Sequence, residues 1–440
     1  MTTPSDPSPH EREIAAVTDV FDILKERGFV AQATDVDELR LYLSDPSSCY
    51  IGFDPTANSL HVGSLVPIMA LAHMQRAGHR PIVVVGGGTG LVGDPSGKTE
   101  MRQMLTLEQI EANVDALRVQ LSRFLDFADD KAIMANNADW LVELRYIDFL
   151  RDIGKHFSVN RMLAAESYKI RMETGLNFIE FNYMLLQSYD FYHLAKVYDC
   201  RLQMGGDDQW GNIVAGIDLV RKKLKKSAHC ITFPLLTTAS GAKMGKTAAG
   251  AVWLSADRTS PFDFYQFWIN TDDRDVERFL KLYTFLAVSE IAVVATLEGR
   301  DLNAAKSILA YEVTKLVHGR EAALAAMEAA SAVFGERRLQ PELLSSSDIP
   351  RTAGEKADGV PTTIVSLERL QAGIAAFDLF AQIQLCDSKS GARRLIKQGG
   401  AYVNEDRING EDFLIRDSHL RDGSLLLKAG KKKVHRIKAG

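Results

Sequence analysis

Residues 49–71 decide the fold, and they read CYIGFDPTANSLHVGSLVPIMAL. The first five residues form an apolar run with the length and β-rich character of a buried strand. Residues 54–59 have turn chemistry, and apolar residues then recur at helical spacing up to Gly78. The stretch therefore predicts a strand, a loop and a helix. His61 and Ser64 lie three residues apart at the helix start, where unpaired N–H groups favour a phosphate chain.

The surrounding chain extends this unit into a sheet. Residues 81–85 read as a second strand, so residues 49–86 predict a βαβ unit with parallel strands. The predicted fold class is α/β, with a Rossmann-like parallel-sheet catalytic domain, an α-helical domain and a small α+β module. The predicted boundaries are a disordered N-terminus at 1–10, the catalytic domain at 11–250, the helical domain at 251–338, a Ser- and Pro-rich linker at 339–362 and the final module at 363–440.

Composition limits the class of protein. A chain of 440 residues is too long for one ordinary core. Residues 391–440 carry 12 Lys and Arg against 6 Asp and Glu, whereas the whole chain has a net charge of −5, so an anionic partner is expected at that end. The four cysteines are scattered and have no metal-binding spacing. With neither a signal core nor an apolar run long enough to cross a bilayer, a cytoplasmic protein without a membrane segment is expected.

Residues 86–99, GGGTGLVGDPSGKT, contain two misleading nucleotide-binding patterns. Gly88, Gly90 and Gly93 match G-x-G-x-x-G, but the following Asp94-Pro95 breaks the helix that a dinucleotide fold needs. Residues 93–99 resemble a P-loop with one residue too few between the glycines. We discount both interpretations.

Polar residues in apolar surroundings mark a candidate site. Tyr183, Gln187 and Asp190 share one face of a helix predicted at 177–197, which is otherwise largely apolar and therefore buried. Buried polar groups need partners, and a polar ligand is a candidate. Residues 205–212, GGDDQWGN, follow a strand predicted at 200–204 and suit a ribose and amino-acid site. Residues 241–247, GAKMGKT, form a flexible cationic loop. No chemistry is predicted for residues 154–160.

Taken together, YIGFDPT at 50–56, HVGS at 61–64, the glycine-rich loop and KMGKT at 243–247 resemble the motifs of class I aminoacyl-tRNA synthetases. Among these the chain is most similar to bacterial-type tyrosyl-tRNA synthetases, over nearly its whole length after about residue 11. The resemblance implies activation of L-tyrosine with ATP to tyrosyl-adenylate, followed by transfer to tRNA(Tyr). It also implies Mg²⁺ accompanying ATP without a dedicated protein site, and a homodimer.

The resemblance assigns roles residue by residue. Tyr50 and Asp190 would bind the phenolic hydroxyl of tyrosine, and Gln209 would lie near its carboxylate. The ammonium group would be held by Asp94, Tyr183 and Gln187. The implied ATP contacts are Gly52, Asp54, Thr56, His61, Ser64, Gly206, Asp208 and Lys246, and the implied catalytic groups are His61, Lys98, Arg102, Lys243, Lys246 and Thr247.

Two positions depart from the family pattern. Ser64 stands where the usual motif has a second His, so a weaker and shorter donor faces the phosphates. Ile51 stands where many relatives have a cysteine, and its side chain cannot form a hydrogen bond with the ribose.

The last module contains a serine-led helix that begins near Ser388. Lys389, Arg393 and Lys397 recur on one face of this helix, and a glycine turn then leads into a strand. The pattern resembles a small RNA-binding module named after a small-subunit ribosomal protein. It implies RNA contacts from Lys389, Arg393, Arg394 and Lys397, with further basic charge at 428–438.

Three alternatives remain at this point. A tryptophanyl-tRNA synthetase is disfavoured by Tyr50 with Asp190, because indole carries no hydroxyl. A small-molecule nucleotidylyltransferase shares the His-containing helix start but has no use for an RNA module. The third alternative is an RNA-binding protein that keeps the synthetase fold but has lost its catalytic activity, and the intact lysine loop disfavours it.

Overall fold

The computed structural model describes residues 19–96, 106–241, 243–247, 250–334, 339–351, 360–421, 423–430 and 433–440. The chain divides into two compact units. One comprises Met1–Thr237 with Lys281–Tyr283, and the other comprises Thr238–Leu280 with Thr284–Gly440. The N-terminus predicted to be disordered, residues 1–10, lies outside the described residues.

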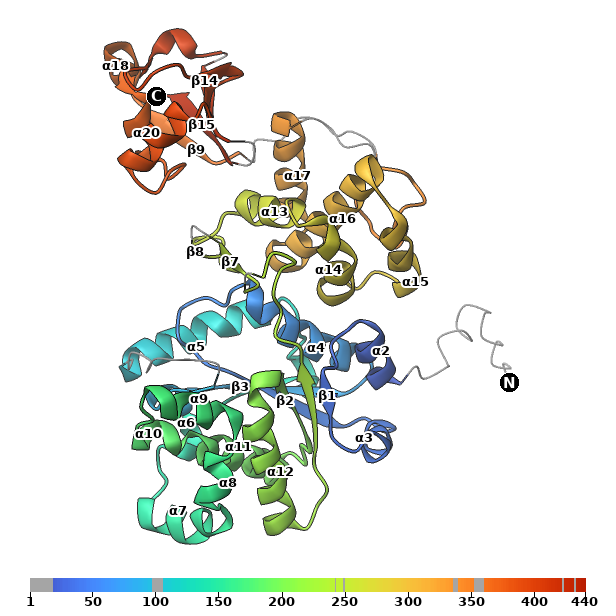
Figure 1. The fold of residues 1–440 in the computed structure, drawn as a ribbon. Coiled ribbons are helices and arrows are strands. Elements are labelled where there is room, and N and C mark those ends of the chain that lie inside the picture. Colours follow the sequence, from blue (N-terminus) through green and yellow to red (C-terminus); the bar gives the residue numbers. More distant parts are fainter. Residues whose placement is uncertain are drawn as a thin grey trace. The chain divides into compact units, whose positions relative to one another are not determined.

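The first unit contains a six-stranded sheet with the strand order β1-β6-β5-β2-β3-β4 (Figure 1). Neighbouring strands from β6 to β4 are parallel, and β1 pairs antiparallel with β6 at one edge. The α/β class is therefore confirmed, and β1 and β4 are additions that the sequence did not predict. The strands are β1 (Gln32–Ala33), β2 (Ser48–Phe53), β3 (Arg80–Val85), β4 (Ile133–Asn136), β5 (Leu202–Gly206) and β6 (His229–Phe233).

The predicted βαβ unit is present as β2, α4 (Leu65–Arg76) and β3, with Tyr50 paired to Ile82. Helix α4 is followed by Gly78 at φ 89°, a left-handed conformation that glycine adopts without steric cost. On the other side of the sheet centre, β5, α12 (Trp210–Leu224) and β6 form a second such unit. Because β3 and β6 lie in opposite directions from the β2–β5 pair, right-handed crossovers place α4 and α12 on opposite faces (Figure 1).

The helix predicted at 177–197 is divided in two at Asn182. Helix α10 (Phe178–Phe181) begins with a capping box between Asn177 and Glu180. After its last residue, the Asn182 side chain donates to the Phe178 carbonyl at 2.7 Å. Such local side-chain bonds compete with helix continuation. The remaining α-helices of this unit are α2 (Val20–Glu26), α3 (Val36–Leu43), α5 (Leu107–Leu121), α6 (Ala138–Leu141), α7 (Tyr146–Asp152), α8 (Val159–Leu163), α9 (Glu166–Thr174), α10 (Phe178–Phe181) and α11 (Tyr183–Val197).

The second unit contains a helical part, with its helices between residues 261 and 334. Its helices are α13 (Pro261–Ile269), α14 (Val276–Tyr283), α15 (Val288–Ile291), α16 (Gly299–His318) and α17 (Arg320–Phe334). None of the described helices, here or elsewhere, is both long and apolar enough to cross a bilayer.

Residues 339–351 pack on these helices, although the sequence predicted a linker from 339. The side chains of Leu344 and Ile349 are buried, and Ser347 donates to the buried carboxylate of Glu312 at 2.5 Å. The Asp348 carboxylate forms an ion pair with Lys315 Nζ at 2.5 Å, and Lys315 lies on α16, as does Glu312. Residues 339–351 therefore pack on the helical part, with Leu343, Leu344 and Ile349 buried.

Residues 360–440 form an α+β part with its own core. Its main sheet has the order β12-β11-β14-β15-β9, and β9 runs parallel to β15. Phe380, Ile396 and Leu427 contribute to a cluster of buried side chains that belongs entirely to this part. Its elements are β9 (Thr362–Val365), α18 (Leu367–Ala372), β10 (Ile374–Ala375), α19 (Ala376–Gln382), α20 (Lys389–Lys397), β11 (Ala401–Val403), β12 (Asp406–Arg407), β13 (Leu414–Ile415), β14 (Ser424–Ala429) and β15 (Lys433–Ala439).

Candidate active site

The parallel strands β2 and β5 lie side by side, and the connections that follow them run to opposite sides of the sheet, toward β3 and toward β6. Open α/β sheets bind ligands at such a switch point. Gly52 on β2 is exposed although Ile51 and Phe53 on either side are buried, and a Cβ added there would meet no atom within 4 Å. At the end of β5, a Cβ on Gly206 would lie 2.5 Å from Oδ1 of Asp208. Gly52 thus leaves open space beside β2, and Gly206 allows the Asp208 side chain to lie close to the end of β5.

Tyr50 and Asp190 are both buried, with 1% and 4% of their surfaces exposed. Within the described part of the chain, the Tyr50 hydroxyl has no hydrogen-bond partner. The Asp190 carboxylate accepts hydrogen bonds from Asn137 Nδ2 at 2.9 Å and Trp140 Nε1 at 2.7 Å. Burial raises the pKa of Asp190 to about 7, and the two hydrogen bonds oppose that rise. Burial and the negative charge of Asp190 raise the pKa of Tyr50, so the two groups are electrostatically coupled.

Asn137 and Trp140 are site residues that sequence reasoning missed. Asn137 is 1% exposed, and besides Asp190 its side chain bonds Thr89 Oγ1 at 2.9 Å and accepts from the Gly88 N–H at 2.8 Å. Both residues follow β4, a strand of four residues that is too short to be recognised alone. A polar residue at the carboxyl end of that strand was the available clue.

A second buried network contains Asp94. Gln209 Nε2 donates to Asp94 Oδ2 at 2.8 Å, and the Ser96 N–H donates to Asp94 Oδ1 at 2.9 Å. Asn212, also missed from the sequence, donates to Gln187 at 3.1 Å and to Gln209 at 3.3 Å. Burial, then the charge of Asp54, raises the pKa of Asp94 to about 6, against the hydrogen bonds. The predicted residues Asp94, Gln187 and Gln209 are therefore connected in one network.

Tyr183 opens α11, and it is 6% exposed on the helix that carries Gln187 and Asp190. Its position four and seven residues before these two gives all three a common face, as the sequence predicted.

The start of α4 presents polar groups to solvent. His61 is exposed, and its Nδ1 accepts a hydrogen bond from the Gly63 N–H at 3.0 Å. In the neutral ring the proton then sits on Nε2, which makes that nitrogen a donor. Thr56 is also exposed, and the half-buried Ser64 makes no capping hydrogen bond to α4. These groups can donate to an anion.

The lysine loop belongs to the second unit. Lys243 is exposed, and the backbone of Lys246–Thr247 forms β7, which pairs antiparallel with β8 (Gly250–Ala251). Lys98 and Arg102 lie outside the described residues. The roles predicted for these four side chains and Thr247 therefore stay predictions.

The predicted RNA-binding residues all lie on α20, whose N-terminus is capped by Ser388 Oγ accepting from the Gly391 N–H at 3.1 Å. Three of the four are paired with acids of the same part: Lys389 with Asp378, and both Arg393 and Lys397 with Glu411. Arg394 is exposed and has no ion pair among the described residues. The face is basic, but most of its charge is locally balanced.

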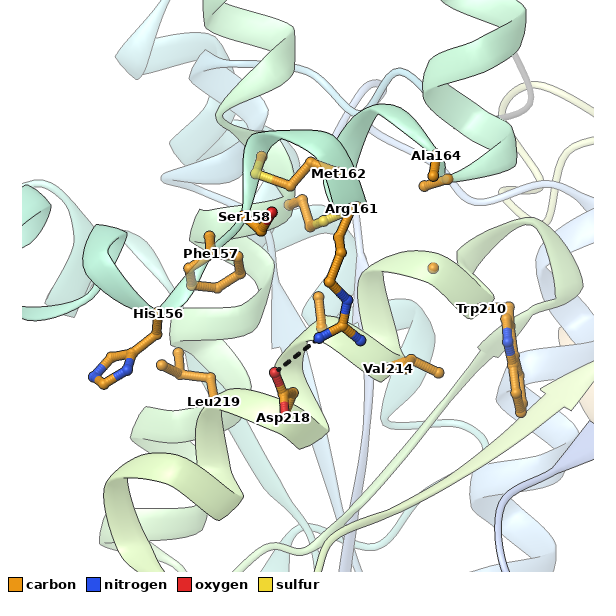
Figure 2. A pocket seen from close by; sticks show the side chains of 14 residues that line it. His156, Phe157, Ser158, Arg161, Met162, Ala164, Trp210, Val214, Asp218 and Leu219 are labelled. Carbon is orange, nitrogen blue, oxygen red and sulfur yellow. Dashed lines mark ion pairs between the residues drawn. The ribbon is translucent and has the colours of Figure 1, made fainter.

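A pocket of about 300 Å³ lies in the first unit between α8, α12 and the segment before α8. Figure 2 shows Arg161 reaching toward Asp218, a pair 3.7 Å apart, with Trp210 and His156 on opposite sides. None of the predicted site residues lines it. Sequence reasoning gave residues 154–160 no role, and the structure places His156, Phe157 and Ser158 in its wall.

Comparison with known proteins places this geometry in a family. Residues 43–335 match the model described as tRNA synthetases class I (W and Y), and residues 353–437 match a tyrosine--tRNA ligase SYY-like C-terminal domain. A tyrosine--tRNA ligase from Desulfatibacillum aliphaticivorans is 60% identical over 95% of this chain and 98% of its own length. One from Clostridium botulinum (strain Eklund 17B / Type B) is 52% identical over 96% and 99%.

Solved structures agree with that placement. A C-terminally truncated Aspergillus nidulans mitochondrial tyrosyl-tRNA synthetase is 31% identical and superposes with a TM-score of 0.66, covering 74% of this chain and 97% of its own. A tryptophanyl-tRNA synthetase from Encephalitozoon cuniculi shares the fold alone, at 14% identity and a TM-score of 0.53, over 73% of this chain and 95% of its own. The chain belongs to the class I tRNA synthetases, in the family that groups the tryptophanyl and tyrosyl enzymes.

Proposed function

We propose that this chain is a tyrosine--tRNA ligase that forms tyrosyl-adenylate from L-tyrosine and ATP and then charges tRNA(Tyr). The observation that carries the choice of tyrosine is the buried pair of Tyr50 and Asp190. An unpartnered hydroxyl and a coupled carboxylate in an apolar setting match a phenolic hydroxyl, which can both donate and accept. An indole side chain has no hydroxyl to offer this pair.

The first step is displacement at the α-phosphorus of ATP. The tyrosine carboxylate oxygen forms the new P–O bond while the bond to pyrophosphate breaks, and no proton needs to move because the nucleophile is already an anion. Positioning and charge stabilisation therefore carry the step. In this proposal Asp94, Tyr183 and Gln187 hold the tyrosine ammonium group, and Gln209 lies near its carboxylate. In the second step a hydroxyl oxygen of the terminal tRNA ribose forms an ester bond with the tyrosyl carbonyl carbon, the bond from that carbon to the AMP phosphate oxygen breaks, and the hydroxyl proton is released.

The remaining groups handle ATP. We assign phosphate contacts to His61, Ser64 and Thr56, with the cationic groups Lys98, Arg102, Lys243 and Lys246 and the hydroxyl of Thr247 meeting the charge that develops on pyrophosphate. Gly52, Asp54, Gly206 and Asp208 would border the nucleoside. In the proposal Mg²⁺ enters as part of the ATP complex.

The test is amino-acid-dependent exchange of labelled pyrophosphate into ATP, run with each of the twenty amino acids. We expect exchange with L-tyrosine alone. Exchange with tryptophan instead would make the chain a tryptophanyl enzyme, and exchange with neither, alongside retained tRNA binding, would leave only an RNA-binding protein. Exchange without any amino acid would point to a nucleotidylyltransferase.

A homodimer is part of the proposal, and the surface of the first unit supports it. Among the described residues, eight of the 17 exposed large apolar side chains fall between residues 142 and 179, with Ile147 71% exposed and Phe178 69% exposed. Large exposed apolar side chains are unfavourable in water, and we infer that a second copy of the chain covers those of this segment. Ile147→Asp should shift the mass in sedimentation equilibrium from two chains to one, whereas Leu41→Asp, at a site 75% exposed, should not. A monomeric parent protein would refute the proposal.

We also place the reaction in the cytosol. All four cysteines are free, and Cys49, Cys200 and Cys230 are buried thiols, which suits a reducing compartment.

A further inference from the structure

His193 forms a ring stack one step behind the Asp190 network. Its imidazole lies 4.4 Å from the Trp140 ring, measured between centroids, with 13° between the planes. His193 follows Asp190 by three residues on α11, so the two side chains share a helix face. Trp140 is on α6 and reaches Asp190 through its indole Nε1–H at 2.7 Å. Helix α11 thus provides both Asp190, which accepts the hydrogen bond from the Trp140 indole, and His193, whose ring covers the indole face.

We propose that His193 is a positioning residue for tyrosine selection, acting through Trp140 on Asp190. The inference rests on the proposed role of Asp190 in binding the phenolic hydroxyl. His193 touches no substrate in this proposal. It fixes the plane of the indole so that its N–H points at the carboxylate.

The physical reason is that the last side-chain torsion of tryptophan is soft. Torsions of this type have broad minima, so a hydrogen bond at the ring edge alone does not define the ring plane. Helix α6 has only four residues, and Trp140 is half-buried, so its own element constrains it weakly. A second aromatic ring in offset contact supplies the missing restraint and is favourable in itself.

The stack acts through its ring and without hydrogen bonding by the imidazole. Among the described residues, neither nitrogen of His193 has a hydrogen-bond partner. Burial, then the charge of Lys196, lowers the pKa of His193, so the ring is neutral at pH 7. Tyr189 is the other aromatic residue beside it, with ring centroids 6.5 Å apart. A neutral aromatic ring without nitrogen should therefore replace His193.

The experiment compares three variants of the full-length enzyme by pyrophosphate exchange. His193→Leu keeps the approximate volume but removes the ring, and His193→Phe keeps a ring. Trp140→Phe keeps the stack but removes the N–H. For each variant we measure kcat/KM for tyrosine and for phenylalanine, together with the KM for ATP and the Tm.

We expect His193→Leu to lower the ratio of tyrosine to phenylalanine kcat/KM by about threefold to tenfold, with the KM for ATP unchanged. His193→Phe should stay within about twofold of the parent, since the stack is preserved. Trp140→Phe should lower the ratio by about tenfold or more, because a hydrogen bond to a buried carboxylate is lost.

A parent-like ratio in His193→Leu with a lowered ratio in Trp140→Phe overturns the role of His193 and leaves that of Asp190 standing. Parent-like ratios in both variants remove the Asp190 network from tyrosine selection, and the inference falls with it. An equal loss in His193→Phe and His193→Leu overturns the stacking mechanism. If His193→Leu does not fold, His193→Gln serves as the second ringless variant with the same expected loss.

Discussion

The polar groups around Asp190 are buried and hydrogen-bonded, whereas the basic groups on α20 are exposed and form surface ion pairs. Asp190 and Asn137 are 4% and 1% exposed, and their hydrogen bonds are fixed in a low-dielectric interior. Lys397 and Arg393 have 72% and 47% of their side chains exposed, and their shared partner Glu411 is a surface acid. Buried polar groups are costly to leave unpaired, whereas exposed ion pairs contribute about 0–1 kcal/mol and are screened by salt.

This difference in solvent exposure suits the two regions to different functions. A buried network can discriminate one hydroxyl, because an unpaired group there has no water to replace its partner. An exposed cationic face attracts a polyanion over a distance, and its strength depends on ionic strength. We therefore expect amino-acid selection to be local and insensitive to salt, and tRNA binding to be distributed and sensitive to it.

The largest effect should come from the cationic loop. Lys246→Ala should lower the rate of adenylate formation by about 10²- to 10³-fold, the usual consequence of losing one transition-state contact of about 2–4 kcal/mol. Tyrosine affinity should be unchanged. Pre-steady-state kinetics measure both, and Lys131→Ala, a surface lysine paired with Asp126, is the matched control. A parent-like rate would remove Lys246 from the site.

Next in size is the loss at the buried carboxylate. Asp190→Ala removes the acceptor of Asn137 and Trp140, so tyrosine kcat/KM should fall about 10²-fold, from a charged hydrogen bond of about 3 kcal/mol. The loss should be the same at low and high salt. Pyrophosphate exchange at two ionic strengths measures it, and a strong salt dependence of the loss would show that amino-acid selection is not confined to the buried network.

Removal of the α+β part tests the contrast between whole regions. A chain ending at residue 351 should keep pyrophosphate exchange, while tRNA charging falls tenfold or more and loses most of its salt dependence. Ending at 345 is the informative comparison, because it also removes the buried side chain of Ile349 and the Ser347 hydroxyl that donates to buried Glu312, which keeps its ion pair with Lys315. That shorter chain should lose about 2–4 kcal/mol in the free energy of unfolding. Equal stability of both chains, measured by urea titration, would mean that residues 346–351 are dispensable.

A pH effect should separate the two carboxylates of the site. Burial raises the pKa of Asp190 to about 7, so Asp190 is ionised above that pH and takes up a proton below it. A protonated carboxyl is a poorer acceptor, and the ratio of tyrosine to phenylalanine kcat/KM should fall about tenfold from pH 8 to pH 6. Protonation of Asp94, with its pKa near 6, affects both amino acids alike and cancels in the ratio. A flat ratio in exchange assays would exclude titration of Asp190 from selection.

The smallest effects belong to single charges on α20. Arg394→Gln should weaken tRNA binding a few-fold and reduce the slope of log affinity against log salt by about 1. Lys397→Gln should do less, because Glu411 lies 2.6 Å from its ammonium group and already balances part of the charge. Glu411→Gln should strengthen binding. Filter binding over a salt series measures all three, and equal effects of Arg394→Gln and Lys397→Gln would show that local pairing is irrelevant.

Much of the site could be read from local patterns. The βαβ unit, the buried face of α11 and the turn after β5 each follow from residues within one or two helical turns of each other. The parts of the site that local patterns did not predict are contacts between residues far apart in the sequence. Asn137 and Trp140 lie 53 and 50 residues from Asp190, and no periodicity connects them. The contacts of residues 339–351 are of the same kind, because Ser347 and Asp348 meet Glu312 and Lys315, which lie 35 and 33 residues away in the sequence.

The sequence by itself determined the fold class, the strand–loop–helix unit at 49–71 and the helix face shared by Tyr183, Gln187 and Asp190. These depend on the backbone periods of 3.6 and 2 residues, which are properties of the local chain. Only the tertiary structure decided that Asp190 is held by Asn137 and Trp140 and that His193 stacks on Trp140. Such contacts arise because the sheet order brings β4 and α11 together, and sheet order is set by the packing of the whole unit.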